Sequence, residues 1–327
     1  MTFATVIDPV LSVKDLTVEF ETRRGRLVAL DGVSLSIRPG EILGVVGESG
    51  AGKSMTGMAV LGLLEPPGRV TGGQIRINGQ RTDNLNDRSM AQIRGRVVGA
   101  IFQDPLTSLN PLFSVGAQLI ETIRLHTDLD RRAARARAVD LLQQVGIPGA
   151  DERITHYPHQ FSGGMRQRVV IALALAGNPA LVIADEPTTA LDVSIQAQIT
   201  ALLRQLCRDK GAGVMLVTHD MGVIAETADR VAVMYAGRVV EIGPVAEVLR
   251  APRHPYTRGL MGSIPALGAR VARLEQIDGS MPRLHAIPEG CAFNPRCPLA
   301  GPRCRRERPR LGAGGAACFL ALQEDVA

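Results

Sequence analysis

The sequence predicts an α/β fold in which a buried parallel sheet is accompanied by a second, antiparallel sheet. Three continuous apolar runs have the composition of buried parallel strands: 42–46, 180–184 and 214–218. Alternating apolar and polar residues indicate strands with one exposed face in three further segments: 10–20, 33–37 and 74–79. A glycine-rich segment begins directly after the first apolar run and leads into a helical pattern.

That glycine-rich segment, Gly47–Ser54, matches the pattern G-x-x-x-x-G-K-[ST] in full. Its glycines allow successive backbone N–H groups to turn around phosphate oxygens, and the following helix N-terminus adds positive potential. In such a loop the lysine contacts the β- and γ-phosphates and the serine hydroxyl binds Mg²⁺. The sequence therefore predicts a nucleoside triphosphate site formed by nine consecutive residues: Gly47, Glu48, Ser49, Gly50, Ala51, Gly52, Lys53, Ser54 and Met55.

A pair of carboxylates, Asp185 and Glu186, follows the apolar run 181–184. A buried strand that ends in an acid is a common way of presenting a carboxylate to Mg²⁺ beside a phosphate loop. We therefore expect Asp185 on the metal side and Glu186 as the general base that activates water. The alternative is an acidic pair that merely ends a strand at the surface.

Ser162, Gly163, Gly164 and Met165 precede a second helix with apolar residues at helical spacing. The N-terminus of this helix is a second anion-binding end. One nucleotide does not require two such ends in one chain, so we expect this segment to contact the γ-phosphate held by another subunit. The alternative is a loop in which Ser162 only caps its own helix.

The remaining patterns divide the chain into a core, residues 1–250, and an extension, residues 251–327. The core contains a mainly helical subdomain at about 103–170, in which Asp130 is expected to cap a helix over 131–145. A second helix is expected from Asp192, and 231–242 reads as a β-hairpin. Nine of the 20 prolines lie beyond residue 250 and mark the extension as a separate, loop-rich part.

Cysteines concentrate in that extension. Four of the five lie close together there, at Cys291, Cys297, Cys304 and Cys318, and we expect them to hold a metal centre. A reducing compartment disfavours disulfides, but the C-x₂₋₄-C pairs typical of zinc sites are missing. Clusters of the [4Fe–4S] type accept more varied spacing, so iron–sulfur, zinc and unliganded thiols all remain open. Cys207 lies alone on a helix and is expected to be structural.

Composition excludes several classes of protein. The net charge is only +5, aromatic residues make up 3% and tryptophan is absent, which leaves little for stacking on bases, so we expect no nucleic acid partner. No stretch approaches the roughly 18 apolar residues of a membrane span. The first residues lack the pattern of a signal peptide, and we therefore expect a cytoplasmic location.

The order of these motifs resembles the ATPase subunits of ABC transporters. The resemblance rests on the phosphate loop, Gln103, the Ser162–Met165 segment, Asp185-Glu186, Asp192 and Thr218-His219-Asp220. It implies a P-loop NTPase core that hydrolyses ATP. It further implies that Gln103 contacts Mg²⁺ or water, that His219 contacts the γ-phosphate, and that Asp192 lies in a loop crossing to a second ATPase subunit.

Two finer segments, 103–111 and 157–168, resemble the ATPase subunits of bacterial oligopeptide and dipeptide permeases, as does 254–257. This resemblance implies a heterodimer with a paralogous ATPase, two transmembrane permease subunits, an external substrate-binding protein, and a position on the cytoplasmic face of the cell membrane. Some such subunits carry a [4Fe–4S] cluster, which favours iron–sulfur here. Nickel importers share much of the pattern, and a non-transport ABC ATPase is the more distant alternative.

Two further expectations follow from the resemblance. The segment 103–126, with Leu112 and Phe113, is expected to receive helices of the transmembrane subunits, the alternative being that these side chains pack inside the helical subdomain. The aromatic residue on which adenine usually stacks falls near Arg24, where no aromatic is present. Either Phe20 takes that place, an arginine stacks on the base through a cation–π contact, or recognition of the base is weak.

Overall fold

The computed structural model describes residues 8–23, 25–189, 191–263 and 276–324. The chain forms two compact units, each assembled from discontinuous segments. The first contains Met1–Leu11, Ile37–Ile42 and Arg76–Val217. The second contains Ser12–Ser36, Leu43–Ile75 and Thr218–Ala327.

The first unit contains a parallel sheet and most of the helices of the core. Its elements, in chain order, are β5 (Gln80–Arg81), α2 (Asp87–Ala91), β6 (Val98–Ile101), α3 (Pro105–Ser108), α4 (Val115–His126), α5 (Arg131–Gln144), α6 (Ala150–Arg153), the 3₁₀ turn η1 (Pro158–Gln160), α7 (Gly163–Ala174), β7 (Leu181–Asp185), α8 (Val193–Lys210) and β8 (Gly213–Val217).

Strands β6, β7 and β8 pair in parallel, with Ile101 opposite Ala184 and Asp185 opposite Val217. Strand β8 is buried along its whole length, and β7 is buried as far as Ala184. This confirms that the apolar runs in the second half of the core are buried parallel strands. Asp185 is the first polar residue of β7 and lies at the carboxyl end of that strand.

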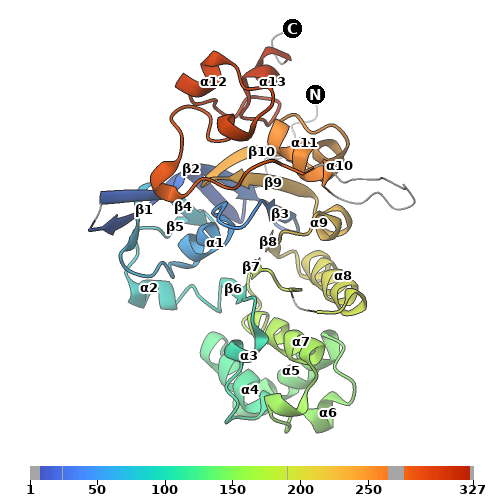
Figure 1. The fold of residues 1–327 in the computed structure, drawn as a ribbon. Coiled ribbons are helices and arrows are strands. Elements are labelled where there is room, and N and C mark those ends of the chain that lie inside the picture. Colours follow the sequence, from blue (N-terminus) through green and yellow to red (C-terminus); the bar gives the residue numbers. More distant parts are fainter. Residues whose placement is uncertain (1–7, 24, 190, 264–275, 325–327) are drawn as a thin grey trace, which may run out of the picture. The chain divides into compact units, whose positions relative to one another are not determined.

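Helices α3 to α7 gather into a subdomain in which α4, α5 and α7 pack on one another (Figure 1). Asp130 caps α5 as expected, because its carboxylate accepts a hydrogen bond from the Ala133 N–H at 2.7 Å. The packed faces carry fully buried side chains from all three helices: Leu119, Ile123, Leu141, Leu142, Val169 and Ile171.

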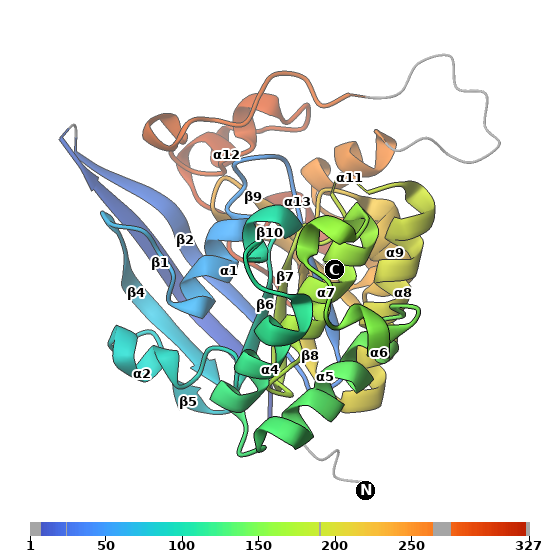
Figure 2. The ribbon, with the colours of Figure 1, turned by 90° about the horizontal axis from the view of Figure 1, so that it is seen from below.

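The second unit holds most of β1 (Leu11–Thr22), β2 (Gly25–Ile37) and β4 (Gly68–Ile77), which lie side by side in the order β2-β1-β4 (Figure 2). Its other core elements are β3 (Ile42–Val46), α1 (Lys53–Leu61), α9 (Met221–Thr227), β9 (Arg230–Tyr235), β10 (Arg238–Pro244) and α10 (Val245–Arg250).

Strand β3 pairs in parallel with β9, and β9 pairs antiparallel with β10. The last two form the expected hairpin, in which Arg238 lies opposite Tyr235. Ala236 and Gly237 make the turn with φ values of 47° and 76°. Positive φ at both central residues matches the right-handed twist of the flanking strands.

The C-terminal extension belongs to this second unit. Its described elements are α11 (Pro255–Gly262), the 3₁₀ turns η2 (Leu284–Ala286) and η3 (Asn294–Arg296), α12 (Pro302–Arg306) and α13 (Phe319–Glu324). Residues 315–317 run beside β10, since the Ile242 N–H donates to the Gly315 carbonyl at 2.8 Å and the Ala317 N–H to the Val240 carbonyl at 2.8 Å.

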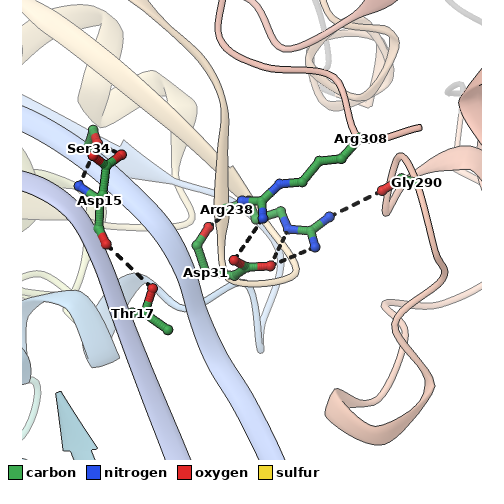
Figure 3. A network of polar contacts seen from close by, with 7 residues as sticks. All are labelled: Asp15, Thr17, Asp31, Ser34, Arg238, Gly290 and Arg308. Carbon is green, nitrogen blue, oxygen red and sulfur yellow. Dashed lines mark hydrogen bonds and ion pairs between the residues drawn. The ribbon is translucent and has the colours of Figure 1, made fainter. Parts of the chain in front are cut away.

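Ion pairs fasten the extension to the strands of the core. Asp31 of β2 accepts hydrogen bonds from Arg238 of β10 at 2.7 Å and from Arg308 of the extension at 2.8 Å (Figure 3). Arg238 also donates to the Gly290 carbonyl at 3.3 Å. Burial raises the pKa of Asp31, but the hydrogen bonds from Arg238 and Arg308 outweigh it and hold the pKa below its usual value.

In the described part of the chain, no helix is both long enough and apolar enough to cross a membrane.

Candidate functional site

The phosphate loop lies between β3 and α1, as the sequence predicts. Three of its glycines have positive φ: 151° at Gly47, 83° at Gly50 and 102° at Gly52. These backbone conformations strongly disfavour residues with a side chain. At Gly52 an added Cβ atom would also lie 2.8 Å from the Leu30 side chain. The backbone conformation of the loop therefore explains the glycines at these three positions.

Lys53 opens α1, and its side chain is buried beneath the loop. Its Nζ donates to the Gly47 carbonyl at 2.9 Å and to the Glu48 carbonyl at 3.1 Å. Ser54 and Met55 follow in the first turn of α1, where backbone N–H groups are not used by the helix itself. The loop thus combines a fixed ammonium group, a hydroxyl and a helix N-terminus, which is the chemistry that binds phosphates and Mg²⁺.

His219 lies between Thr218 and Asp220, just before α9, and its side chain is exposed. Both neighbours are fixed by hydrogen bonds. The Thr218 N–H donates to the Val45 carbonyl at 3.2 Å, and the Asp220 carboxylate caps α9 by accepting from the Gly222 N–H at 2.8 Å. A rigid backbone on both sides gives His219 a defined position after the strand.

Glu186 adopts a conformation that is rare for a residue with a side chain. Its φ is 48°, and its N–H donates to the Val217 carbonyl at 2.9 Å. Such a backbone typically costs about 1–3 kcal/mol and clusters at functional sites. Gln103 Nε2 and Thr189 Oγ1 donate to the same carboxylate oxygen, Oε2, at 3.0 and 2.9 Å. The structure therefore brings the Gln103 side chain to Glu186, the residue that directly follows Asp185.

Thr189 is a contact of Glu186 that sequence reasoning did not assign. It occurs three residues after Glu186 in a turn, where its N–H also donates to the Glu186 carbonyl at 3.2 Å. The sequence feature that could have indicated this contact is a threonine three residues after the proposed general base. A short turn after the strand brings the two side chains together.

The Ser162–Met165 segment forms the beginning of α7. Ser162 is the N-cap and accepts a hydrogen bond from the Met165 N–H at 3.4 Å. Around Gly163 there is open space for a Cβ atom, whereas one at Gly164 would lie 2.8 Å from Ile195 of α8. Asp192 is the N-cap residue of α8 and is exposed. The residues that the resemblance expects to act on a neighbouring subunit thus lie at the N-termini of two helices of this unit.

The expected adenine-binding residues are only partly described. Arg24 lies outside the described residues. The Phe20 ring packs against the backbone near Gly68, where an added Cβ atom would lie 2.7 Å from the ring. Phe20 is half-buried.

Cys291, Cys297, Cys304 and Cys318 line one common cavity of about 20 Å³. A cavity of this size admits about one water molecule. Burial raises the pKa of the Cys291 thiol to about 11 and also raises that of Cys297. Among the described residues, no group of three or more His, Cys, Asp or Glu side chains is arranged to hold a metal ion. The four cysteines therefore line one small cavity, but the described side chains do not form the expected metal-ligating group.

Cys207 behaves differently from these four. It is buried on α8, and its thiol donates to the Ala212 carbonyl at 2.9 Å. This fits the structural role expected from its isolated position.

The fold and the phosphate loop together define a P-loop nucleoside triphosphatase with an appended C-terminal extension. Comparison with known families makes this more specific: residues 30–189 match the profile of the ABC transporter family, and residues 240–304 match the C-terminal region of oligopeptide and dipeptide transporters. The chain belongs to the ABC transporter family of ATP-binding subunits and is an ATPase.

Curated relatives match over nearly the whole chain. The dipeptide transport ATP-binding protein DppD of Escherichia coli K12 is 46% identical over 301 residues, which cover 92% of each chain. DppD of Bacillus subtilis is 49% identical over 304 residues, covering 93% of this chain and 91% of that protein. A putative peptide import ATP-binding protein of Brucella melitensis is 47% identical over 317 residues, covering 93% of this chain and 94% of that protein.

Solved structures of ATP-binding cassettes share the fold. The dimeric post-hydrolysis structure of the cassette MJ0796 with ADP and Pi is 30% identical, with a TM-score of 0.64, and covers 72% of this chain and 98% of that one. The cassette cbiO1 of Clostridium perfringens is 28% identical, with a TM-score of 0.65, and covers 75% of this chain and 92% of that one.

Proposed function

We propose that this chain is the ATP-hydrolysing subunit of a bacterial ABC importer for di- and oligopeptides. The observation that carries the proposal is the match of residues 240–304 to the C-terminal region of oligopeptide and dipeptide transporters. Peptide-transport relatives that align over 92% of the chain support the same conclusion. The subunit works on the cytoplasmic face of the cell membrane with two transmembrane permease subunits and an external substrate-binding protein.

Individual residues are given the following roles in ATP hydrolysis. Lys53 contacts the β- and γ-phosphates, Ser54 binds Mg²⁺, and the backbone from Gly47 to Met55 surrounds the phosphates. Gln103 and Asp185 contact Mg²⁺ or its water ligands, and His219 contacts the γ-phosphate. Glu186 accepts a proton from the attacking water, and the hydrogen bonds from Gln103 and Thr189 to its carboxylate support this role by fixing its orientation.

The Ser162–Met165 segment and Asp192 act across a dimer interface, on the ATP held by a paralogous ATPase subunit. The capped N-terminus of α7 supports this role, since it offers backbone N–H groups to an anion. A cassette related in sequence, MJ0796, has been solved as a dimer.

Two alternatives have different partners. A nickel-chelate importer would use the same ATPase chemistry with another binding protein. A non-transport ABC ATPase acting on nucleic acid or ribosomes usually carries two cassettes in one chain, whereas this chain has a single phosphate loop. Purification of the chain from detergent-solubilised membranes separates an importer from a non-transport ATPase. Recovery with two transmembrane subunits supports the importer, and stable recovery with ribosomes would overturn it.

Three exposed apolar side chains of the segment 103–126, Leu106, Leu112 and Phe113, make up what we call the coupling surface. Their exposed fractions are 62%, 79% and 54%, so they do not pack inside the helical subdomain. Hydrogen bonds hold the loop that carries Leu112 and Phe113, because Gln118 Nε2 donates to the Asn110 and Phe113 carbonyls, both at 3.0 Å. A fixed loop with large apolar side chains turned outward suits a helix of another chain. We propose that it receives the cytoplasmic helices of the permease subunits.

Changing Phe113 to Asp is expected to uncouple transport while leaving ATP binding intact. An anchor residue of this kind typically contributes about 2 kcal/mol to association, or roughly 30-fold in affinity. Co-purification of the permease subunits and peptide uptake should both fall, while titration with a fluorescent ATP analogue stays at the wild-type value. Leu129→Asp, at another exposed apolar side chain, is the control and should retain transport. If Phe113→Asp lost nucleotide binding to the same extent as transport, the variant would have a folding defect, and this result would contradict the assignment.

We further propose that the four cysteines hold a metal centre, with [4Fe–4S] favoured and Zn²⁺ as the alternative. The support is the type of donor: thiolates ligate either group, and the four thiols line one apolar cavity, which would have to open to admit a cluster. Such a centre would supply structural stability to the extension, as metals do in small loop-rich modules. Ligation requires deprotonated thiols, and a bound metal would reverse the upward shift of the Cys291 pKa.

Cys297→Ser is expected to lower the bound metal and make the extension sensitive to protease. The measurements are iron, sulfide and zinc content, absorbance near 400 nm, and limited proteolysis followed by mass spectrometry. Cys207→Ser is the matched control and should retain the metal, because Cys207 lies outside the group of four. A Cys297→Ser protein with no metal but normal protease resistance and assembly would contradict the structural role.

A further inference from the structure

We infer that the C-terminal extension supplies two positioning residues, Tyr256 and Arg296, which hold the phosphate loop at Glu48. Both contacts join segments far apart in the sequence. The Glu48 N–H donates to Tyr256 Oη at 2.9 Å, and Arg296 Nη1 donates to Glu48 Oε2 at 3.0 Å. Glu48 is the second residue of the phosphate loop, so the extension contacts the loop where it leaves β3. The inference rests on the proposed use of this loop to bind ATP.

Tyr256 is held in place by an aromatic cluster. It is fully buried, and its ring makes an edge contact with Tyr235 at 4.7 Å between centroids. Phe293 contacts both tyrosines, with centroid distances of 5.4 Å to Tyr256 and 5.2 Å to Tyr235. One side of the cluster therefore comes from strand β9 and the other from the extension. This packing fixes the orientation of the buried phenol ring, so that its hydroxyl oxygen accepts the hydrogen bond from the Glu48 N–H.

Arg296 is fixed by a larger set of contacts. Only 8% of its side chain is exposed, and it donates to the Asp278 carbonyl at 2.8 Å as well as to Glu48. Its guanidinium also lies over the ring of Tyr235, at 5.8 Å from the centroid. A long side chain that is already ordered loses little entropy when it holds the loop, and its planar fork serves several acceptors at once.

Glu48 connects these two residues to the phosphate-binding lysine. Its N–H donates a hydrogen bond to Tyr256, and its carboxylate accepts one from Arg296. Its carbonyl accepts hydrogen bonds from Lys53 Nζ and from the Ala51 N–H, both at 3.1 Å. A shift of Glu48 would therefore move an acceptor of Lys53 and the turn that follows it. Arg296, which contacts the phosphate loop, directly precedes Cys297, which lines the cysteine cavity. The phosphate loop and the cysteine segment are therefore connected through two adjacent residues.

Two variants test the positioning role in the intact complex. Arg296→Ala should weaken binding of ATP about tenfold, the loss expected for one hydrogen bond between charged groups. Tyr256→Phe, which removes only the hydroxyl, should weaken it about fivefold. In both, KM for ATP should rise while kcat stays within about twofold, because the catalytic carboxylate is untouched. Arg296→Lys keeps a positive charge near Glu48 and should restore part of the affinity.

Arg308→Ala is the matched control, since Arg308 fastens the same extension to Asp31 without contacting the loop. Titration with a fluorescent ATP analogue gives Kd, and steady-state ATPase assays give KM and kcat. Wild-type Kd and KM in Arg296→Ala and Tyr256→Phe would overturn the inference, as would equal loss of affinity in Arg308→Ala. A wild-type complex that bound no ATP would instead overturn the proposed function, so the two failures are distinguishable.

Discussion

Replacing Glu186 with Gln is expected to leave ATP binding intact and to lower ATP turnover by about 10²–10⁴-fold, the usual effect of losing a general base. The amide has nearly the same shape as the carboxylate and still accepts hydrogen bonds, so Gln103 and Thr189 keep an acceptor. It cannot take a proton from water. The unusual backbone of Glu186, with φ at 48°, is equally accessible to glutamine.

The measurement is single-turnover hydrolysis in the assembled complex, together with titration of ATP. Glu152→Gln, at an exposed acid on α6, is the control and should hydrolyse ATP at the wild-type rate. Near-normal turnover in Glu186→Gln would show that another group activates the water. Loss of ATP binding in the same variant would mean that Glu186 supports the fold of the site instead of its chemistry.

Lys53→Ala should have the opposite signature, with ATP binding itself lost. Truncating one partner of a buried, hydrogen-bonded charge pair costs about 2–5 kcal/mol, which is roughly 30- to several-thousand-fold in affinity. The Lys53 ammonium also closes the loop through the Gly47 and Glu48 carbonyls, so its removal takes one hydrogen-bond donor from each of these carbonyls.

Equilibrium titration with a fluorescent ATP analogue measures this loss directly. Lys14→Ala, at an exposed lysine on β1, is the control and should bind ATP normally. Unchanged affinity in Lys53→Ala would contradict the assignment of Gly47–Ser54 as the nucleotide site. Together, the Glu186 and Lys53 variants separate hydrolysis from binding.

Features carried by contiguous residues could be predicted from the sequence. The loop 47–54, the cap at Asp130, the hairpin over β9 and β10 and the buried runs of β7 and β8 each depend on local spacing and composition. The helix over 131–145 is found as α5 with an end shifted by one residue. For these elements, local backbone preference and burial favour the same structure.

Contacts between distant residues could not be predicted in this way. Nothing near Tyr256 or Arg296 in the sequence indicates that both reach Glu48, because a buried aromatic and a paired arginine have no local periodicity. The cysteines illustrate the same limit. Their spacing suggested a shared site, and they do line one cavity, but its small volume depends on the packing of Phe293, Phe319 and neighbouring side chains.

The most direct test of the peptide-importer function is ATP-driven uptake into vesicles that contain the complete complex. A radiolabelled dipeptide and its external binding protein are supplied on one side, and ATP on the side that faces this subunit. The proposed function predicts accumulation of the dipeptide that requires ATP and is abolished by Glu186→Gln. Accumulation of a nickel chelate without any uptake of peptide, by a complex that hydrolyses ATP normally, would contradict it.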